Sequence, residues 1–232
     1  MKLYTHTRSK RKSIGKIQLF PTLMLALLAG SAGIWMALQT SEPDNALETI
    51  QASLDNALIF PADFKSVPTF SLLDQHETTT TEESMQGQWN LVFFGFTHCP
   101  DVCPMTLSVV RDVVEDIKAD DNLPNPQVTF VTVDPKRDTP EKLNDYMAFF
   151  NPEFTGLTGD LNAIYELTRP MNVVAQFTAN DENPDAYTVD HTASIFLIDP
   201  ELKVRGSFKV PHETESILAD YRVMMTHLAP QS

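Results

Sequence analysis

The chain has 232 residues, of which 42% are hydrophobic and 21% are charged, and its formal net charge is −14. This composition suits one folded domain of ordinary size with extensions and excludes wholesale disorder, while two cysteines are too few for a disulfide-rich scaffold or a four-cysteine zinc site. The acidic balance disfavours nucleic acid as a partner, because phosphate backbones repel such a surface.

The charge is distributed unevenly along the chain. The first 40 residues contain six of the 17 Lys and Arg and none of the 31 Asp and Glu, so they carry +6 and the remainder carries −20. Residues 17–38 form a run of 22 residues without a charge, and a helix of that length spans roughly 33 Å, enough for a bilayer core. We therefore predict a transmembrane anchor over residues 17–38, preceded by a basic segment over residues 1–16.

Basic residues beside a membrane span favour the cytoplasmic side. The sequence thus predicts a single-pass membrane protein with its N-terminus in the cytoplasm and its acidic body in the periplasm, or in the intermembrane space if the protein is mitochondrial. The alternative is a cleaved signal peptide, because residues 29–33 are small and suit a cleavage site. Against cleavage, the apolar run continues to Leu38. No cysteine follows the span, which excludes a lipid anchor there.

The next segment, residues 39–57, is polar and is predicted to be a linker. Leu47, Ile50 and Leu54 give it only a weak helical face. The folded domain is expected over residues 58–232.

Within that domain, residues 77–84 are polar and are expected to form a loop. Residues 89–94 are an apolar run, as expected for a buried strand. A loop with both cysteines follows, and then a helix is predicted with Pro104 at its first position, where a missing N–H costs nothing. Its apolar positions recur at helical spacing and are Met105, Val109, Val110, Val113, Val114 and Ile117.

Residues 128–133 are predicted to form the next strand. Thr139 before Pro140 is typical of a helix start, with the threonine as the cap. Asp160 is expected to cap a shorter helix that ends before Pro170.

Two further strands are predicted over residues 194–198 and 204–208, joined by a turn at residues 199–201. A last helix is expected from its apolar positions, which are Ile217, Leu218, Tyr221, Met225 and Leu228. Strand and helix patterns therefore alternate along the domain, and this order predicts an α/β fold with a central sheet flanked by helices.

The two cysteines, Cys99 and Cys103, lie where the first apolar strand passes into a helix. Unpaired N–H groups and the helix dipole favour negative charge at such a junction, so we expect lowered thiol pKa values. A structural disulfide would close too short a loop to gain much stability. A thiol–disulfide oxidoreductase usually has two residues between its cysteines, and this chain has three. A metal site would need a further ligand.

Among the histidines, His191 is the candidate for that ligand. It lies just before the apolar strand at residues 194–198, where it can face the loop that follows another strand. A hydrogen-bonded packing role is the alternative. The remaining histidines are less suitable, being before the span, in a polar loop, adjacent to Cys99 or beside the last helix: His6, His76, His98, His212 and His227. Two thiolates and one imidazole suit copper, and zinc with a fourth ligand from water or a carboxylate remains open.

Four blocks of the sequence, in order, resemble the signatures of the Sco/SenC family. They are residues 94–104 (FGFTHCPDVCP), 131–140 (VTVDPKRDTP), 157–159 (LTG) and 187–192 (YTVDHT). Together they run through most of residues 70–228, which makes the resemblance far more specific than the cysteine spacing alone. The turn after residue 198 lacks the glycine often found there, and residues 179–186 are not diagnostic.

The resemblance implies a thioredoxin-like fold behind a membrane anchor, with copper bound by Cys99, Cys103 and His191. It implies a metallochaperone that delivers copper to the dinuclear centre of cytochrome c oxidase subunit II and receives it from an upstream donor. Such a protein needs no bond-making catalysis.

The alternative role is a thiol–disulfide reductase that keeps the cysteines of that subunit reduced, with Cys99 and Cys103 as its redox-active disulfide. In thioredoxin-like oxidoreductases a cis-proline usually faces the cysteines, and the resemblance places His191 in that neighbourhood, which weakens this reading. A peroxidase is disfavoured because residues 94–104 contain no arginine.

Overall fold

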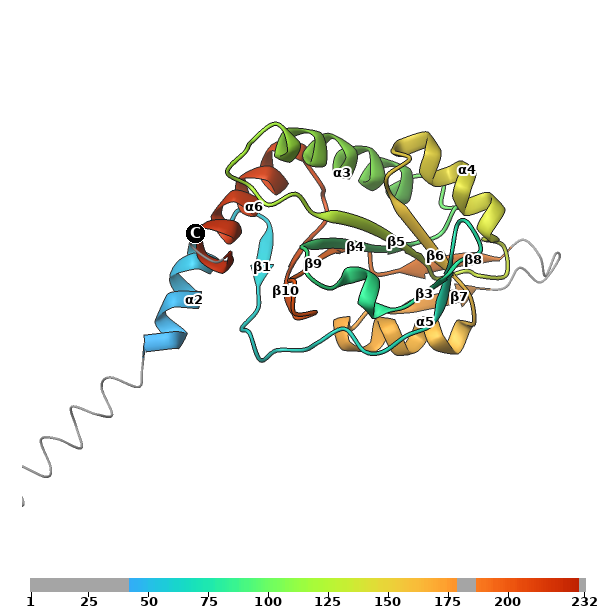
Figure 1. The fold of residues 1–232 in the computed structure, drawn as a ribbon, viewed down its shortest axis with the longest axis horizontal. Coiled ribbons are helices and arrows are strands. Elements are labelled where there is room, and N and C mark those ends of the chain that lie inside the picture. The colour runs from blue at the N-terminus through green and yellow to red at the C-terminus, as the bar shows by residue number, and fades with distance from the viewer. Residues whose placement is uncertain (1–41, 179–186, 230–232) are drawn as a thin grey trace, which may run out of the picture. The chain divides into compact units, whose positions relative to one another are not determined.

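The computed structural model describes residues 42–178 and 187–229 (Figure 1). Residues 46–232 form one compact unit, separate from residues 1–45, and the fold described below is that of the larger unit. The predicted anchor, residues 17–38, lies outside the described residues. Within the part that is described, no helix has both the length and the apolar character needed to cross a bilayer.

Eight strands form the main sheet, in the spatial order β1-β10-β9-β4-β5-β6-β2-β3. In chain order their bounds are β1 (Ala57–Ile59), β2 (Leu72–Asp74), β3 (Thr79–Thr80), β4 (Asn90–Gly95), β5 (Gln127–Thr132), β6 (Thr155–Thr158), β9 (Ile195–Ile198) and β10 (Val204–Phe208). Strands β4, β5 and β6 are parallel, and β9 runs antiparallel to β4. A second sheet consists of β7 (Ala175–Thr178) and β8 (Thr188–His191), paired antiparallel.

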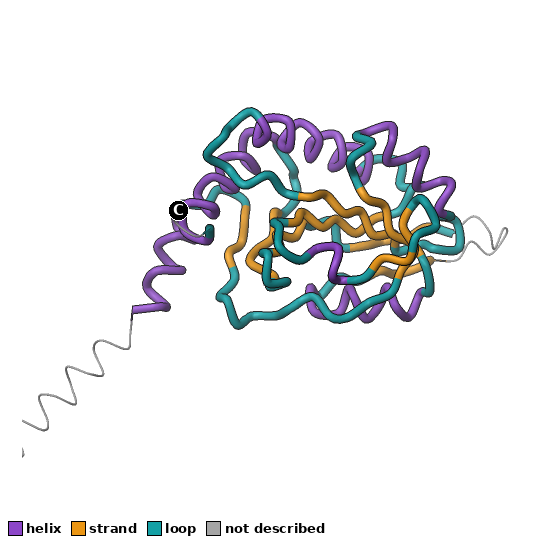
Figure 2. Tube along the Cα trace, in the orientation of Figure 1, coloured by secondary structure: helices purple, strands orange, loops and turns teal. Residues whose placement is uncertain are grey.

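Helices cover both faces of the main sheet (Figure 2). The described helices are α2 (Glu42–Ala52), α3 (Val102–Lys118), α4 (Pro140–Phe150), α5 (Leu161–Thr168) and α6 (Thr214–Leu228), with two short 3-10 turns, η1 (Glu82–Met85) and η2 (Arg169–Met171). Helices α3 and α4 lie on one face and α5 on the other (Figure 1). Every residue of β4 and of β9 is buried, because both strands are covered from both sides.

The α/β fold class predicted from the sequence is confirmed. Helix α4 is capped by Thr139, whose side chain accepts a hydrogen bond from the amide of Lys142. Helix α5 is capped by Asp160 in the same way. The helix that follows the cysteine loop begins two residues earlier than expected, so Pro104 is its third residue, still within the first turn where N–H groups lack helical partners.

Several short elements differ from the sequence-based expectation. Residues 77–84, expected as a loop, contain β3 and the first three residues of η1. Residues 39–57 contain helix α2 and the first residue of β1. The β7–β8 hairpin was also not anticipated. Strands of two to four residues at a sheet edge or in a separate hairpin carry too few apolar positions to show a period, so pattern alone does not reveal them.

Candidate metal centre

The cysteine loop is packed directly against the central strands of the sheet. A Cβ atom on Gly95, at the end of β4, would lie 2.7 Å from a ring carbon of Phe130 and 2.9 Å from Cys103 Sγ. Real Cβ atoms do not approach other atoms so closely, so only glycine allows the Cys103 sulfur to pack on this strand. The loop therefore holds its second cysteine in a place fixed by the core.

The two cysteines are free thiols in unlike surroundings. Cys103 is completely buried, whereas Cys99 is half-buried and faces a pocket. The backbone N–H of Cys103 donates to Cys99 Sγ at 3.4 Å, so an amide of the first turn of α3 points at that sulfur, as expected of a helix start.

His191 is the last residue of β8 and brings its ring to the same place. Its Nε2 atom lies 3.4 Å from Cys103 Sγ, and its Nδ1 atom lies 3.0 Å from the carbonyl oxygen of Thr192. Because a carbonyl can only accept, Nδ1 carries the proton and donates it to Thr192. The Nε2 lone pair is then directed at the sulfurs, which is the tautomer that a metal-binding imidazole requires.

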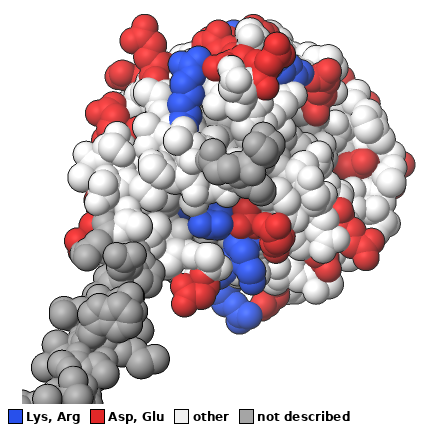
Figure 3. Space-filling view, turned by 60° about the vertical axis from the view of Figure 1, so that its left-hand side comes forward, with Lys and Arg blue, Asp and Glu red and all other residues white. Residues whose placement is uncertain are grey.

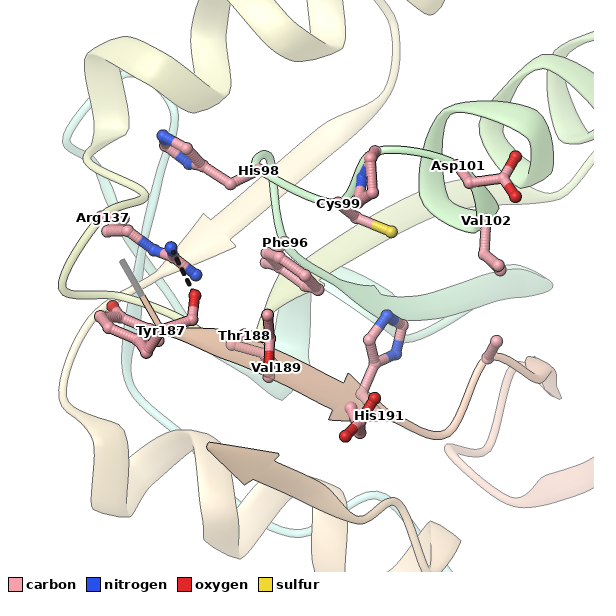
Figure 4. Close-up of a pocket in the computed structure, with 13 residues that line it drawn as sticks. Phe96, His98, Cys99, Asp101, Val102, Arg137, Tyr187, Thr188, Val189 and His191 are labelled. Carbon is pink, nitrogen blue, oxygen red and sulfur yellow. Dashed lines mark hydrogen bonds between the residues drawn. The ribbon is translucent and has the colours of Figure 1, made fainter. Parts of the chain in front are cut away.

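The structure thus brings together all three residues predicted from the sequence. Their ligand atoms lie within 4.8 Å of one another. Two atoms bonded to one ion at about 2.0–2.3 Å lie at most about 4.6 Å apart, so only a small adjustment would allow all three to bind the same ion. Cys99 and His191 border a pocket of about 350 Å³ and project into it (Figure 4).

Burial is the largest influence on the pKa values of Cys103 and His191. Desolvation raises the pKa of the Cys103 thiol strongly and outweighs a hydrogen bond from the backbone of Phe96, so the prediction of a lowered pKa is wrong for this cysteine. Burial also lowers the pKa of His191, against the opposing effects of Thr192 and Asp190. At neutral pH the apo site therefore holds a protonated Cys103 and a neutral imidazole.

The other described histidines do not join the site. His98 points away from Cys99 (Figure 4), with its Nδ1 atom 3.1 Å from Thr97 Oγ1. His212 packs against Thr106. Within residues 42–178 and 187–229, the two cysteines and His191 are the only group of three or more Cys, His, Asp or Glu side chains with metal-ligand spacing. His6 lies outside the described residues.

The groups that hold the site in place were not apparent from the sequence pattern. Asp138 is completely buried and accepts hydrogen bonds from Thr97 N (2.9 Å), Thr97 Oγ1 (2.6 Å) and Thr132 Oγ1 (2.6 Å), which fixes the loop just before Cys99. Asp134 and Arg137 contact Tyr187, which precedes β8. All lie in blocks of the sequence that carried the family resemblance, but spacing alone gave them no role.

Comparison with known proteins agrees with this arrangement. The family model described as SCO1/SenC matches residues 61–226. The chain belongs to the SCO1/SenC family. The matched region contains all three residues of the site.

Relatives of this SCO1/SenC protein occur in mitochondria and bacteria. A protein named "Protein SCO2 homolog, mitochondrial" from Bos taurus is 37% identical over 180 residues, covering 77% of this chain and 65% of that protein. A "Putative copper-binding protein" from Stutzerimonas stutzeri is 32% identical over 184 residues, covering 78% of this chain and 88% of that one. The chain therefore spans less than two thirds of the bovine relative.

Solved structures of the family share the fold, which confirms the expected thioredoxin-like Sco architecture. Bradyrhizobium japonicum ScoI with copper bound is 34% identical with a TM-score of 0.60, and the match covers 68% of this chain and 98% of that one. Yeast Sco1 with copper bound is 26% identical with a TM-score of 0.65, and the match covers 72% and 91%.

Proposed function

We propose that this SCO1/SenC protein is a metallochaperone that binds copper through Cys99, Cys103 and His191 and delivers it to the dinuclear copper centre of cytochrome c oxidase subunit II. The observation that carries the proposal is the convergence of two sulfurs and an imidazole nitrogen within 4.8 Å. Relatives whose structures contain copper, such as Bradyrhizobium japonicum ScoI, support the choice of metal.

The donor set favours copper over zinc. Thiolates select Cu(I), and an imidazole also suits Cu(II). Structural zinc sites have four protein ligands, and among the described residues no fourth Cys, His, Asp or Glu side chain joins this group. Three ligands leave a copper ion open to a partner, which suits cargo that must be passed on.

The burial of the ligands suggests an order of transfer. Because Cys103 has no exposed surface, an incoming ligand reaches copper from the side of Cys99 and His191. Partner ligands would then replace these two first, and Cys103 would release the ion last. Each step exchanges one metal–ligand bond for another, so no redox change or bond-making catalysis is needed.

Copper titration of the full-length reduced chain, in competition with a chelator of known Cu(I) affinity, tests the proposal. We expect one copper ion per chain, loss of binding in Cys99→Ser and Cys103→Ser, and weaker binding in His191→Ala. His98→Ala is the matched control, because that ring is turned away from the site, and it should bind like the wild type. Equal affinity in all five proteins would refute the proposed ligand set.

A second function, reduction of a partner's disulfide, is favoured by the closeness of the two thiols. The hydrogen bond from Cys103 N to Cys99 Sγ holds the cysteines together without His191. This role needs both sulfurs and is incompatible with bound copper, so the two functions would alternate in one chain. His191→Ala should keep disulfide-reductase turnover and weaken copper binding if both functions exist. Loss of the two activities together would favour a single, copper-dependent role.

We also propose the location that the sequence predicts, with residues 17–38 as a membrane anchor, residues 1–16 on the cytoplasmic side and residues 39–57, which include α2, as the linker. The folded domain, residues 58–232, would lie in the periplasm or the mitochondrial intermembrane space. Reporter fusions at residue 40 and protease accessibility in sealed vesicles test this topology.

Acidic side chains are spread over the visible face rather than gathered in one patch (Figure 3), so charge alone does not mark where subunit II or a copper donor would bind.

A further inference from the structure

The histidine half of the site is carried by an element outside the main sheet. Among the described strands, β7 and β8 pair only with each other. Along β8 the side chains alternate, so that Val189 is buried and His191 partly buried while Thr188 and Asp190 are exposed. Tyr187, one residue before the strand, falls on the same inward face as Val189 and His191.

Three contacts join Tyr187 to Arg137 and Asp134. Arg137 Nη1 donates to its carbonyl oxygen at 3.2 Å (Figure 4), and the guanidinium carbon lies 3.8 Å from the centre of its ring. The hydroxyl of Tyr187 donates to Asp134 Oδ1 at 2.6 Å. Asp134 is almost completely buried and also forms an ion pair with Arg137 Nε.

The same arginine connects Tyr187 to the aromatic wall of the site. Its guanidinium carbon lies 5.8 Å from the ring centre of Phe96, on the loop that leads to the cysteines. The Phe96 ring in turn meets the His191 ring edge to face, with centres 5.6 Å apart and planes at 84°. Tyr187, Arg137, Phe96 and His191 therefore form a continuous series of contacts, which we call the Arg137 stack.

The residue after Arg137 holds the other half of the site. Asp138 accepts hydrogen bonds from both the amide and the hydroxyl of Thr97, two residues before Cys99. The amides of Arg137 and Asp138 both donate to the carbonyl oxygen of Asp134, which fixes this turn. Within one turn, Arg137 thus binds the residue before β8, and its neighbour Asp138 binds the loop before Cys99.

We infer that Arg137 is a positioning residue, which holds β8 in the register that places His191 against the cysteines. Tyr187 lies four residues before His191, about 13 Å along an extended strand. Fixing its backbone, ring and hydroxyl fixes the rotation of the strand, and a slip of one residue would turn His191 to the solvent face. This inference rests on the proposed function, since it explains how the third copper ligand is kept in place.

A double-mutant cycle of copper affinity tests the inference on the full-length reduced chain. Arg137→Lys keeps the charge beside Asp134 but loses the planar group that stacks and the fork that reaches Tyr187. We expect its Cu(I) affinity to fall about tenfold, the lower end of the loss seen when a residue that orients a ligand is removed. Combining it with His191→Ala should add nothing beyond His191→Ala alone. Independent, additive losses would overturn the inference.

The Cu(II) form gives a readout that a general loss of stability would not change. Paramagnetic resonance of wild type should show coupling to the imidazole nitrogen, and Arg137→Lys should weaken it. Arg111→Lys, at a half-buried position of α3 where the arginine pairs with Asp112, is the matched control and should keep both affinity and coupling. Unchanged coupling in Arg137→Lys would overturn the inference.

A second variant covers the case in which Arg137→Lys does not fold. Tyr187→Phe keeps the ring and the carbonyl but loses the hydrogen bond to Asp134, and it should show the same effects in smaller measure. If wild type binds no copper, the proposed function fails, and the inference is then decided by NMR contacts between the rings of Phe96 and His191 in the copper-free chain. Loss of these contacts in Arg137→Lys supports the inference, and their persistence refutes it.

Discussion

The cysteine half and the histidine half of the site are built differently. Cys103 is completely buried and packs on Gly95, at the end of a strand that lies between β5 and β9 in the centre of the main sheet. His191 is the last residue of β8, a four-residue strand of a separate hairpin. The other strand of that hairpin, β7, is poorly covered: Phe177 in β7 is 38% exposed and Val174, just before it, is 65% exposed. A dithiol fixed by the core thus meets a histidine held by a few specific contacts, and the two halves should respond differently to perturbation.

The largest effect is expected where the cysteine half depends on one buried carboxylate. Asp138→Ala removes the acceptor of three hydrogen bonds from Thr97 and Thr132 in a completely buried place. Leaving such donors unpaired costs about 1–3 kcal/mol each, partly offset by rearrangement of the loop, so we expect a loss of about 4 kcal/mol in the free energy of unfolding. Urea unfolding of the copper-free chain, followed by circular dichroism, measures it.

Asp138→Asn is the matched variant, because it keeps the shape and one acceptor oxygen. It should lose about half as much stability as Asp138→Ala. A loss below about 1 kcal/mol in Asp138→Ala would mean that the cysteine loop is held by its packing and not by this carboxylate.

Hydrogen exchange compares the two halves directly. We expect the hydrogen-bonded amides of β8 to exchange about 100-fold faster than those of β4, because the hairpin can open without unfolding the main sheet. That ratio corresponds to a difference of about 3 kcal/mol in opening free energy. Arg137→Lys should accelerate exchange in β8 and leave β4 unchanged, and equal rates in the two strands of wild type would contradict the comparison.

The pH dependence of copper binding should reflect the cysteine half. Burial raises the pKa of Cys103, so this thiol is protonated at neutral pH and must lose its proton when copper binds. Burial lowers the pKa of His191, so the imidazole is already neutral and releases no proton. Cu(I) affinity should therefore rise with pH by at least about tenfold per unit, or 1.4 kcal/mol, for the proton of Cys103.

Competition titrations between pH 6.5 and 8.5 measure this slope. Any copper binding that remains in Cys103→Ser should depend on pH less steeply, by one proton. An affinity in wild type that is flat or falls as pH rises would show that Cys103 is not a thiolate ligand.

The sequence predicted the elements and caps that depend on local pattern, but not the contacts and pKa shifts that depend on residues far apart in the chain. The junction of strand, cysteine loop and helix was expected, as were the caps Thr139 and Asp160, because each is encoded within a few neighbouring residues. The contact between Arg137 and Tyr187 joins residues 50 positions apart, and no spacing rule predicts it. The pKa of Cys103 was misjudged for the same reason, since burial depends on the packing of the whole fold.

The smallest effect is expected at His212, which links α3 to the segment after β10. Its Nδ1 atom lies 2.9 Å from Thr106 Oγ1, and its Nε2 atom lies 3.4 Å from the carbonyl oxygen of Phe208. Burial lowers the pKa of His212, so the unfolded chain takes up a proton near pH 6.5 while the native chain resists it. The stability that the neutral ring supplies is therefore present above pH 6.5 and is lost as pH falls toward the lowered native pKa.

His212→Gln should therefore be less stable than wild type by about 1 kcal/mol at pH 7.5, and this difference should shrink as pH falls to 5.5. Urea unfolding at pH 7.5, 6.5 and 5.5 measures the trend. His227→Gln is the matched control, because His227 is exposed in the last turn of α6, and its difference from wild type should stay near zero throughout. A constant difference for His212→Gln would show that the ring contributes packing alone, and the pH response of the fold would then belong to other buried groups.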